Sequence, residues 1–153
     1  MKTLKEEGCD ASLTMVGPDA DGSLKNVRSL ADSLDVRVEF TGKLPKKEWI
    51  ELSKSHNIFI NTTNFDNMPV SVIETMALGL PIVSTNVGGI PYLIEDKVDG
   101  VLVNPDSVPE FVSAIKKLLQ NTNETHEMAK KARRKVEDFD WSVVKTKWFS
   151  VLS

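Results

Sequence analysis

Cysteine is almost absent from this chain of 153 residues, since Cys9 is the only one. A single cysteine excludes an internal disulfide and favours a cytoplasmic setting over a secreted, disulfide-stapled domain. Long apolar runs are missing as well. No stretch is long enough to span a bilayer, and the first twenty residues lack the apolar centre of a signal peptide. The sequence therefore predicts a cytoplasmic protein without a transmembrane segment.

Charge of one sign is not in excess either. The chain has 19 Lys and Arg against 22 Asp and Glu, a formal charge of -3, which argues against nucleic acid as the main partner. No His, Cys or acidic residues show metal-ligand spacing, so neither a metal nor another cofactor is expected. The absence of a G-x-G-x-x-G motif between a strand and a helix argues against a dinucleotide-dependent oxidoreductase.

What the sequence does contain is an alternation of short apolar runs and helical patterns. Strands are predicted at Ser12–Val16, Arg37–Thr41, Ile58–Asn61, Pro81–Ser84 and Gly100–Val103. Helices are predicted after Asp21-Gly22-Ser23, over Lys46–Ser55, from Pro69, near Pro109, over about Glu124–Asp138 and over Trp141–Leu152, with a polar break at Asn121-Thr122-Asn123. This order is typical of a parallel sheet flanked by helices on both faces. With no linker or repeat, it predicts one Rossmann-like three-layer α/β domain over residues 1–153.

The most informative stretch runs from Asn64 to Gly89 and reads NFDNMPVSVIETMALGLPIVSTNVGG. Pro69 suits the first turn of a helix, and the free amides that follow it would form an anion site for a diphosphate. Glu74 lies on the same helix face as Ser71, so its two oxygens could accept both hydroxyls of a ribose diol.

A second anion site is predicted after the strand that ends in Thr85. Gly88 and Gly89 would let backbone amides approach a ligand without an intervening Cβ atom. Ligands of open parallel sheets bind beyond the carboxyl ends of the strands, and the candidate residues all follow strands. The sequence therefore predicts a nucleotide-sugar site along one rim.

This pattern resembles the donor-binding half of glycosyltransferase family 4, retaining enzymes whose two Rossmann-like domains form the GT-B fold. The resemblance is carried by PVSVIETMALGLPIVSTNVGGIPYLI and supported by LTMVGPD, VEFTGKL and DGVLVNPDSVPEFVSAIKKLL, which together cover nearly the whole chain. The family signature has two glutamates with seven residues between them. Counting back from Glu74 leads to Asp66, which keeps the carboxylate but is shorter by one CH₂. The loop or the sugar would have to sit closer for the same hydrogen bond.

The resemblance implies a donor-binding domain for transfer of a sugar from a UDP-sugar or GDP-sugar to a glycan or lipid-linked acceptor, as in polysaccharide or glycolipid synthesis. It also implies that an acceptor domain, and a first strand with a basic loop, precede Met1. The fragment alone would then transfer little, and any peripheral membrane association would come from the absent domain. The alternative is a noncatalytic nucleotide-binding or protein-interaction module, which Asp66 and the missing basic loop favour.

The resemblance also assigns the site residues. Asp66 and Glu74 would be the catalytic pair, and backbone groups after the second strand would cup the nucleobase. The expected donor-binding residues are Gly17, Pro18, Gly42, Lys43, Leu44, Asn67, Met68, Pro69, Val70, Ser71, Glu74, Thr85, Gly88 and Gly89.

Three of these assignments have a purely structural alternative. Glu74 could be a solvated helix acid, Asp66 could shape a turn with Asn67, and the two glycines could mark an ordinary turn.

Two features near the end of the chain are read as structural. The basic run Lys130–Lys135 is predicted to be a solvated helix face. Trp141 and Trp148 are predicted to anchor the last helix to the sheet; the alternative is an exposed apolar face that belongs to an interface with a partner domain.

Overall fold

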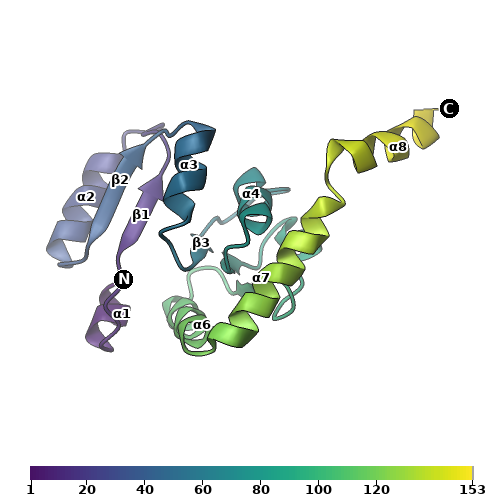
Figure 1. The fold of residues 1–153 in the computed structure, drawn as a ribbon. Coiled ribbons are helices and arrows are strands. Elements are labelled where there is room, and N and C mark those ends of the chain that lie inside the picture. Colours follow the sequence, from purple (N-terminus) through teal and green to yellow (C-terminus); the bar gives the residue numbers. More distant parts are fainter. Residues whose placement is uncertain (153) are drawn as a thin grey trace. The chain divides into compact units, whose positions relative to one another are not determined.

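The computed structural model describes residues 1–152, which form two compact units, Met1–Lys54 and the residues from Ser55 onward (Figure 1). Ser153, the last residue of the predicted domain, lies outside the described residues. Each unit is a parallel α/β arrangement with its own strand pairing. The prediction that both belong to one domain stays a prediction.

The first unit pairs two parallel strands. Its elements are α1 (Lys2–Glu6), β1 (Leu13–Val16), α2 (Leu24–Ser33), β2 (Val38–Gly42) and α3 (Lys46–Ser53). Leu13 lies opposite Val38 in the ladder. Both strands coincide with predicted ones to within one residue at each end, because their apolar runs are short and bounded by turn residues.

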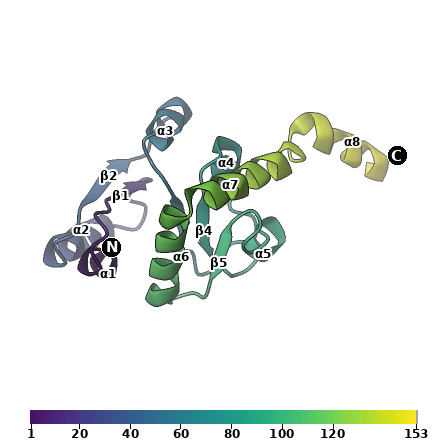
Figure 2. The ribbon, with the colours of Figure 1, turned by 60° about the horizontal axis from the view of Figure 1, so that its bottom comes forward.

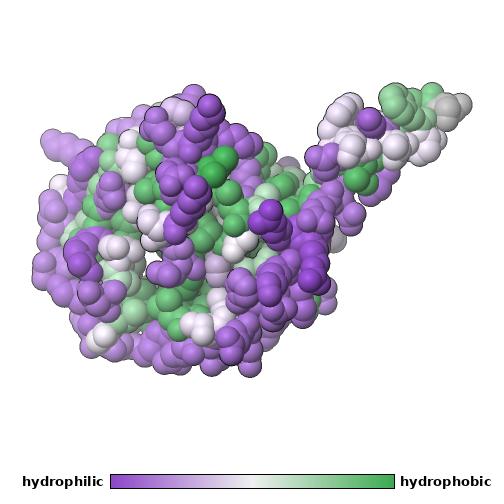
Figure 3. Space-filling view, in the orientation of Figure 1, coloured by the Kyte–Doolittle hydropathy of each residue, from purple (hydrophilic) through white to green (hydrophobic). Residues whose placement is uncertain are grey.

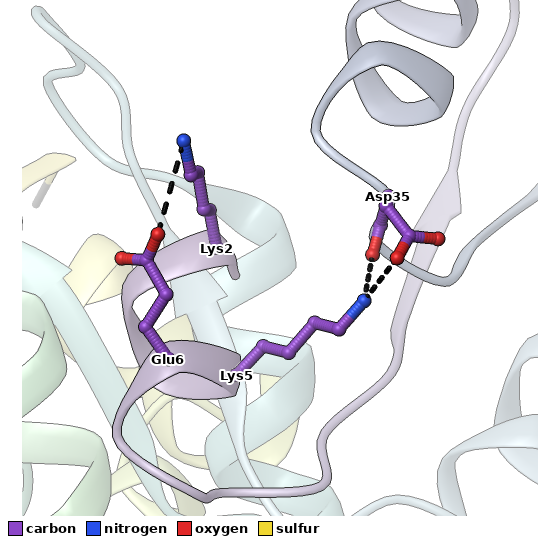
Figure 4. A network of polar contacts seen from close by, with 4 residues as sticks. All are labelled: Lys2, Lys5, Glu6 and Asp35. Carbon is purple, nitrogen blue, oxygen red and sulfur yellow. Dashed lines mark hydrogen bonds and ion pairs between the residues drawn. The ribbon is translucent and has the colours of Figure 1, made fainter.

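Helix α1 has no counterpart among the predicted elements. One apolar residue, Leu4, is buried, and Lys5 donates hydrogen bonds to Asp35, at 2.7 Å to the carbonyl and 2.5 Å to Oδ2 (Figure 4). This contact with Lys5 holds the pKa of Asp35 below its ordinary value. A helix this short is marginal by itself, so contacts distant in sequence, rather than a periodic pattern, account for it.

The second unit contains a parallel sheet in the order β3-β4-β5, with β4 in the centre. Figure 2 shows β4 beside β5. Its elements are β3 (Phe59–Asn61), α4 (Val70–Leu78), β4 (Ile82–Thr85), α5 (Ile90–Leu93), β5 (Val101–Val103), α6 (Val108–Gln120), α7 (Thr122–Glu137) and α8 (Trp141–Leu152). All four residues of β4 are buried, as expected of a central strand covered on both faces.

Neighbouring residues of β4 point into two separate cores, one on each face of the sheet. Ile82 packs in a cluster with Met76 of α4 and Val136 of α7. Val83 packs in another cluster with Leu118 of α6. Successive side chains of a strand point to opposite faces, so this division confirms the predicted three-layer arrangement in this unit.

Helix α4 ends at Gly79, which has a φ of +73° and caps the helix in the left-handed conformation. Glycine adopts this conformation without a Cβ penalty, which explains why the helix ends here.

The polar break after α6 is shorter than predicted. Thr122 and Asn123 belong to α7, and Asn121 alone separates the two helices. The hydroxyl of Thr125 donates a 2.8 Å hydrogen bond to the Leu118 carbonyl. This bond satisfies a carbonyl at the end of α6. A single residue is therefore enough to connect the two helices.

The predicted anchoring of the last helix by its tryptophans is wrong. No described residue of α8 is buried, and Trp141 and Trp148 are 68% and 56% exposed. Hydrophobic residues lie on the surface of α8 in Figure 3. The apolar residues of α8 therefore form an exposed face, which is the alternative that the sequence left open.

Candidate functional site

Five of the predicted donor-binding residues lie in the first unit, just beyond its two strands. The amide of Gly17, after β1, donates a 2.9 Å hydrogen bond to the carbonyl of Gly42, the last residue of β2. The loops after the two strands therefore lie side by side. Gly42 has a φ of +68°, a left-handed conformation that favours glycine at this turn. Pro18 and Lys43 are exposed, and Leu44 is half-buried.

The other predicted residues lie in the second unit, around the start of α4. This helix begins at Val70, and Pro69 is its extended N-cap residue, so Pro69 stands one position before the predicted first turn. The Pro69 carbonyl accepts hydrogen bonds from the amides of Val72 and Ile73, at 3.1 and 3.2 Å.

The amides of Val70 and Ser71 have no hydrogen-bond acceptor among the described residues. Both residues are exposed. Two donors at the positive end of the helix dipole are therefore available to an anion, and the binding of a diphosphate here stays a prediction.

Asp66 shapes the turn that leads into this helix. Its Oδ1 atom accepts a 3.0 Å hydrogen bond from the Met68 amide, two residues further on. This bond is an Asx turn, so the turn-forming interpretation of Asp66 is confirmed. The other oxygen, Oδ2, takes no part in this bond. Contact of that oxygen with a sugar stays a prediction.

Glu74 lies in the second turn of α4 and is half-buried. The residues that follow it, Thr75 and Met76, are fully buried. Glu74 thus stands at the border between the core and the surface, three residues after Ser71. Its predicted contact with a ribose stays a prediction.

Gly88 and Gly89 lie directly against the Asp66 turn. The Gly89 amide donates a 2.8 Å hydrogen bond to the Asp66 carbonyl. A Cβ atom on Gly89 would come within 1.7 Å of the Asn67 carbonyl oxygen, and one on Gly88 within 2.2 Å of the Asp66 carbonyl oxygen. The space in front of these glycines is therefore filled by protein backbone. The Gly89 amide is already bonded, which differs from the second anion site that the sequence predicts.

Thr85 makes a second link between the same two segments. It is 1% exposed, and its hydroxyl donates a 2.6 Å hydrogen bond to the Thr63 carbonyl. Beside it, the buried hydroxyl of Ser84 accepts a 3.1 Å hydrogen bond from the Asn61 side-chain amide. Thr63, Ser84 and Asn61 are not among the predicted site residues. The sequence did contain a signal for these contacts, because the hydroxyls of Ser84 and Thr85 in a buried strand need hydrogen-bond partners.

Residues 1–152 contain no group of three or more His, Cys, Asp or Glu side chains arranged to hold a metal ion. None of the described helices combines the length and apolar character needed to cross a membrane.

The parallel sheet, its two helical layers and the loops beyond its strands are features of the GT-B glycosyltransferase fold. Residues 1–135 match the family of glycosyl transferases group 1, so the chain belongs to this family. The prediction of a glycosyltransferase with the GT-B fold is therefore confirmed, and the assignment to family 4 stays a prediction.

Two curated relatives illustrate the range of the family. The chain is 32% identical over 111 residues to the sulfoquinovosyl transferase SQD2 of Arabidopsis thaliana, covering 71% of this chain and 22% of that protein. It is 28% identical over 145 residues to an uncharacterized glycosyltransferase of Haemophilus influenzae, covering 94% of this chain and 40% of that protein. The chain thus spans less than half the length of these relatives.

Solved structures confirm the fold. Anabaena HepE in complex with UDP superimposes with a TM-score of 0.85 at 23% identity, over 93% of this chain and 40% of that one. Sucrose-phosphate synthase from Thermosynechococcus elongatus gives a TM-score of 0.85 at 19% identity, over 99% of this chain and 40% of that one.

Proposed function

We propose that this chain is the donor-binding part of a retaining glycosyltransferase that uses a UDP-sugar or a GDP-sugar. The observation that carries this proposal is the start of α4. There the Val70 and Ser71 amides have no acceptor in the described protein, and along the chain they follow the turn of Asp66 and precede Glu74.

The chemistry that this arrangement supports is stabilisation of a leaving diphosphate. The two amides and the helix dipole would bind the phosphate oxygens. Their attraction would become stronger as negative charge develops on the diphosphate during bond cleavage. The Glu74 oxygens would accept hydrogen bonds from the two ribose hydroxyls, and Asp66 Oδ2 one from a sugar hydroxyl. Because amides and a helix dipole would supply the positive potential, we propose that no metal is required.

In the proposed reaction, the bond between the anomeric carbon and the diphosphate oxygen breaks. A bond from the acceptor oxygen to that carbon forms on the same face, and the proton of the acceptor hydroxyl passes to the departing phosphate. The acceptor, a glycan or a lipid-linked sugar, would be held by a second domain. Closure of that domain would exclude water from the donor.

Relatives support the nucleotide as the ligand. HepE has been crystallised with UDP and with UDP-glucose, and SQD2 is a sulfoquinovosyl transferase. The chain spans only part of such proteins, so the presence of a second domain is itself proposed. The single cysteine supports a cytoplasmic location.

Thermal shift and calorimetric titration with UDP, GDP, ADP and NAD test the proposal. A ligand at 100 times its Kd should stabilise the chain by about 2.7 kcal/mol. We expect UDP or GDP to do so selectively, with the effect lost in Glu74→Ala and kept in Glu124→Ala, a matched change on the exposed start of α7.

Two outcomes would count against the proposal. Undiminished binding by the Glu74→Ala variant would remove Glu74 from the site. Failure of all four nucleotides, also with a chain extended upstream to include the expected basic loop, would favour a noncatalytic module.

A further inference from the structure

The Asp66–Asn67 turn rests on two glycines that are distant from it in the sequence. We propose that Gly88 and Gly89 are positioning residues, whose missing side chains make room for this turn and thereby set the place of the Asp66 carboxylate. This inference rests on the proposed function, because it assigns to the donor site a part that does not touch the donor.

The steric evidence involves backbone on both sides. The ideal Cβ of Gly89 lies 1.7 Å from the Asn67 carbonyl oxygen and 2.6 Å from its carbonyl carbon. The Cβ of Gly88 would lie 2.2 Å from the Asp66 carbonyl oxygen. Backbone atoms cannot rotate away as the end of a side chain can. An alanine at either position must therefore displace the turn or the segment on which it rests.

Hydrogen bonds join the same two segments at two points. The Gly89 amide bonds to the Asp66 carbonyl at 2.8 Å, and the Thr85 hydroxyl bonds to the Thr63 carbonyl at 2.6 Å. The Asp66 side chain in turn accepts a hydrogen bond from the Met68 amide, just before α4 begins. A displacement at Gly89 would thus be passed through Asp66 to the first amides of the helix.

Side-chain burial holds this turn only weakly. Phe65 and Met68 are 74% and 53% exposed, and Asn67 is exposed as well. Pro69 is the buried residue of this stretch. With so little apolar surface packed, the position of the turn depends mainly on the backbone contacts with Gly88 and Gly89.

Gly79 offers a matched control. It also has a positive φ, +73°, but a Cβ built on it meets nothing within 4 Å. Gly79→Ala would therefore strain the end of α4 and lower overall stability without displacing the Asp66 turn. Any effect shared by Gly79→Ala and Gly89→Ala reflects stability, whereas an effect confined to Gly89→Ala reflects position.

The first test needs no ligand. Amide hydrogen exchange followed by NMR should show the Met68 amide exchanging at least about ten-fold faster in Gly89→Ala than in Gly79→Ala at matched overall stability. Equal protection in the two variants would overturn the inference. If Gly89→Ala does not fold, Gly88→Ala takes its place, since a Cβ atom there would meet the Asp66 carbonyl oxygen at 2.2 Å. Wild-type protection of Met68 in that variant would count equally against the inference.

The second test uses UDP and UDP-glucose. The Kd of UDP divided by the Kd of UDP-glucose measures the contribution of the sugar to binding. We expect this ratio to fall towards one in Gly89→Ala and to stay at the wild-type value in Gly79→Ala. A wild-type ratio in Gly89→Ala would overturn the inference. If the wild-type chain binds neither compound, the proposed function fails in its UDP form, while the exchange experiment still decides whether the glycines position the turn.

Discussion

Lys135 on α7 donates a 2.7 Å hydrogen bond to Oδ2 of Asp99, a residue of the loop that leads into β5. The Asp99 side chain is only 5% exposed, and its Oδ1 atom accepts the Glu95 amide at 2.8 Å. The carboxylate therefore joins the last core helix to the loop. Among the Lys and Arg residues of the basic run, Lys135 departs from the predicted solvated face.

Replacing Lys135 with methionine should destabilise the chain by about 1–3 kcal/mol, because it leaves a buried carboxylate without its cation. The cost is smaller than for a fully buried pair, since the Lys135 side chain is 33% exposed. Urea denaturation measures it. Lys131→Met, on the exposed part of the same helix, should stay within about 0.5 kcal/mol. Equal losses in the two variants would show that the ion pair contributes nothing specific.

Asp66→Asn separates the two roles of this residue. Asparagine keeps the oxygen that accepts the Met68 amide, so the Asx turn and the fold should persist. The loss of charge should weaken a proposed bond to a sugar hydroxyl, lowering UDP-glucose affinity about ten-fold, or about 1.4 kcal/mol, with UDP affinity unchanged.

Asp66→Glu, the residue of the family signature, provides the contrast. Its extra CH₂ removes the geometry of the Asx turn, so it should loosen the turn instead. Calorimetry with UDP and UDP-glucose compares the two variants. Unaltered UDP-glucose binding in Asp66→Asn would leave Asp66 with a structural role alone.

Glu110 should make stability depend on pH. Its two oxygens accept the Asn104 amide at 2.8 Å and the Asn104 side-chain amide at 2.9 Å, and these bonds lower its pKa from the ordinary value of 4.5. A carboxyl whose pKa is lower in the folded state stabilises the fold fully above its ordinary value, and this contribution disappears as pH falls through the lowered value.

Comparison with Glu110→Gln by urea denaturation between about pH 3 and pH 7 checks this. The wild type should be the more stable at neutral pH, and the difference should shrink below about pH 4.5. A difference independent of pH would contradict the role of the ionised carboxylate.

The strands and the longer helices could be predicted because their signals are local. The run from Ile82 to Thr85 combines β-branched residues with a boundary of turn residues, and the apolar stripe that includes Val112, Ile115 and Leu118 repeats at helical spacing. The short helix α1 could not be predicted, since five residues carry no periodic pattern and its hydrogen bond from Lys5 reaches Asp35, 30 residues further along the chain. The exposure of Trp148 was also missed, because an amphipathic pattern does not say whether a partner surface is present.

The candidate site divides in the same way. The start of α4 and the turn-forming property of Asp66 follow from residue type and order, because proline, aspartate and a helix end act within a few residues. The role of Gly88 and Gly89 did not follow. Their composition indicated a close approach of backbone, but the sequence could not say whether a ligand or another loop approaches.

The sequence by itself determined which segments form the strands and the longer helices, where the carboxyl ends of the strands fall, and which family the motifs resemble. Only the tertiary structure decided that the backbone of the Asp66 turn fills the space in front of the two glycines. The physical reason is that local preferences act over a few residues. The contact between Asp66 and Gly89 exists only once β3 and β4 have paired and brought the loops beyond their ends together.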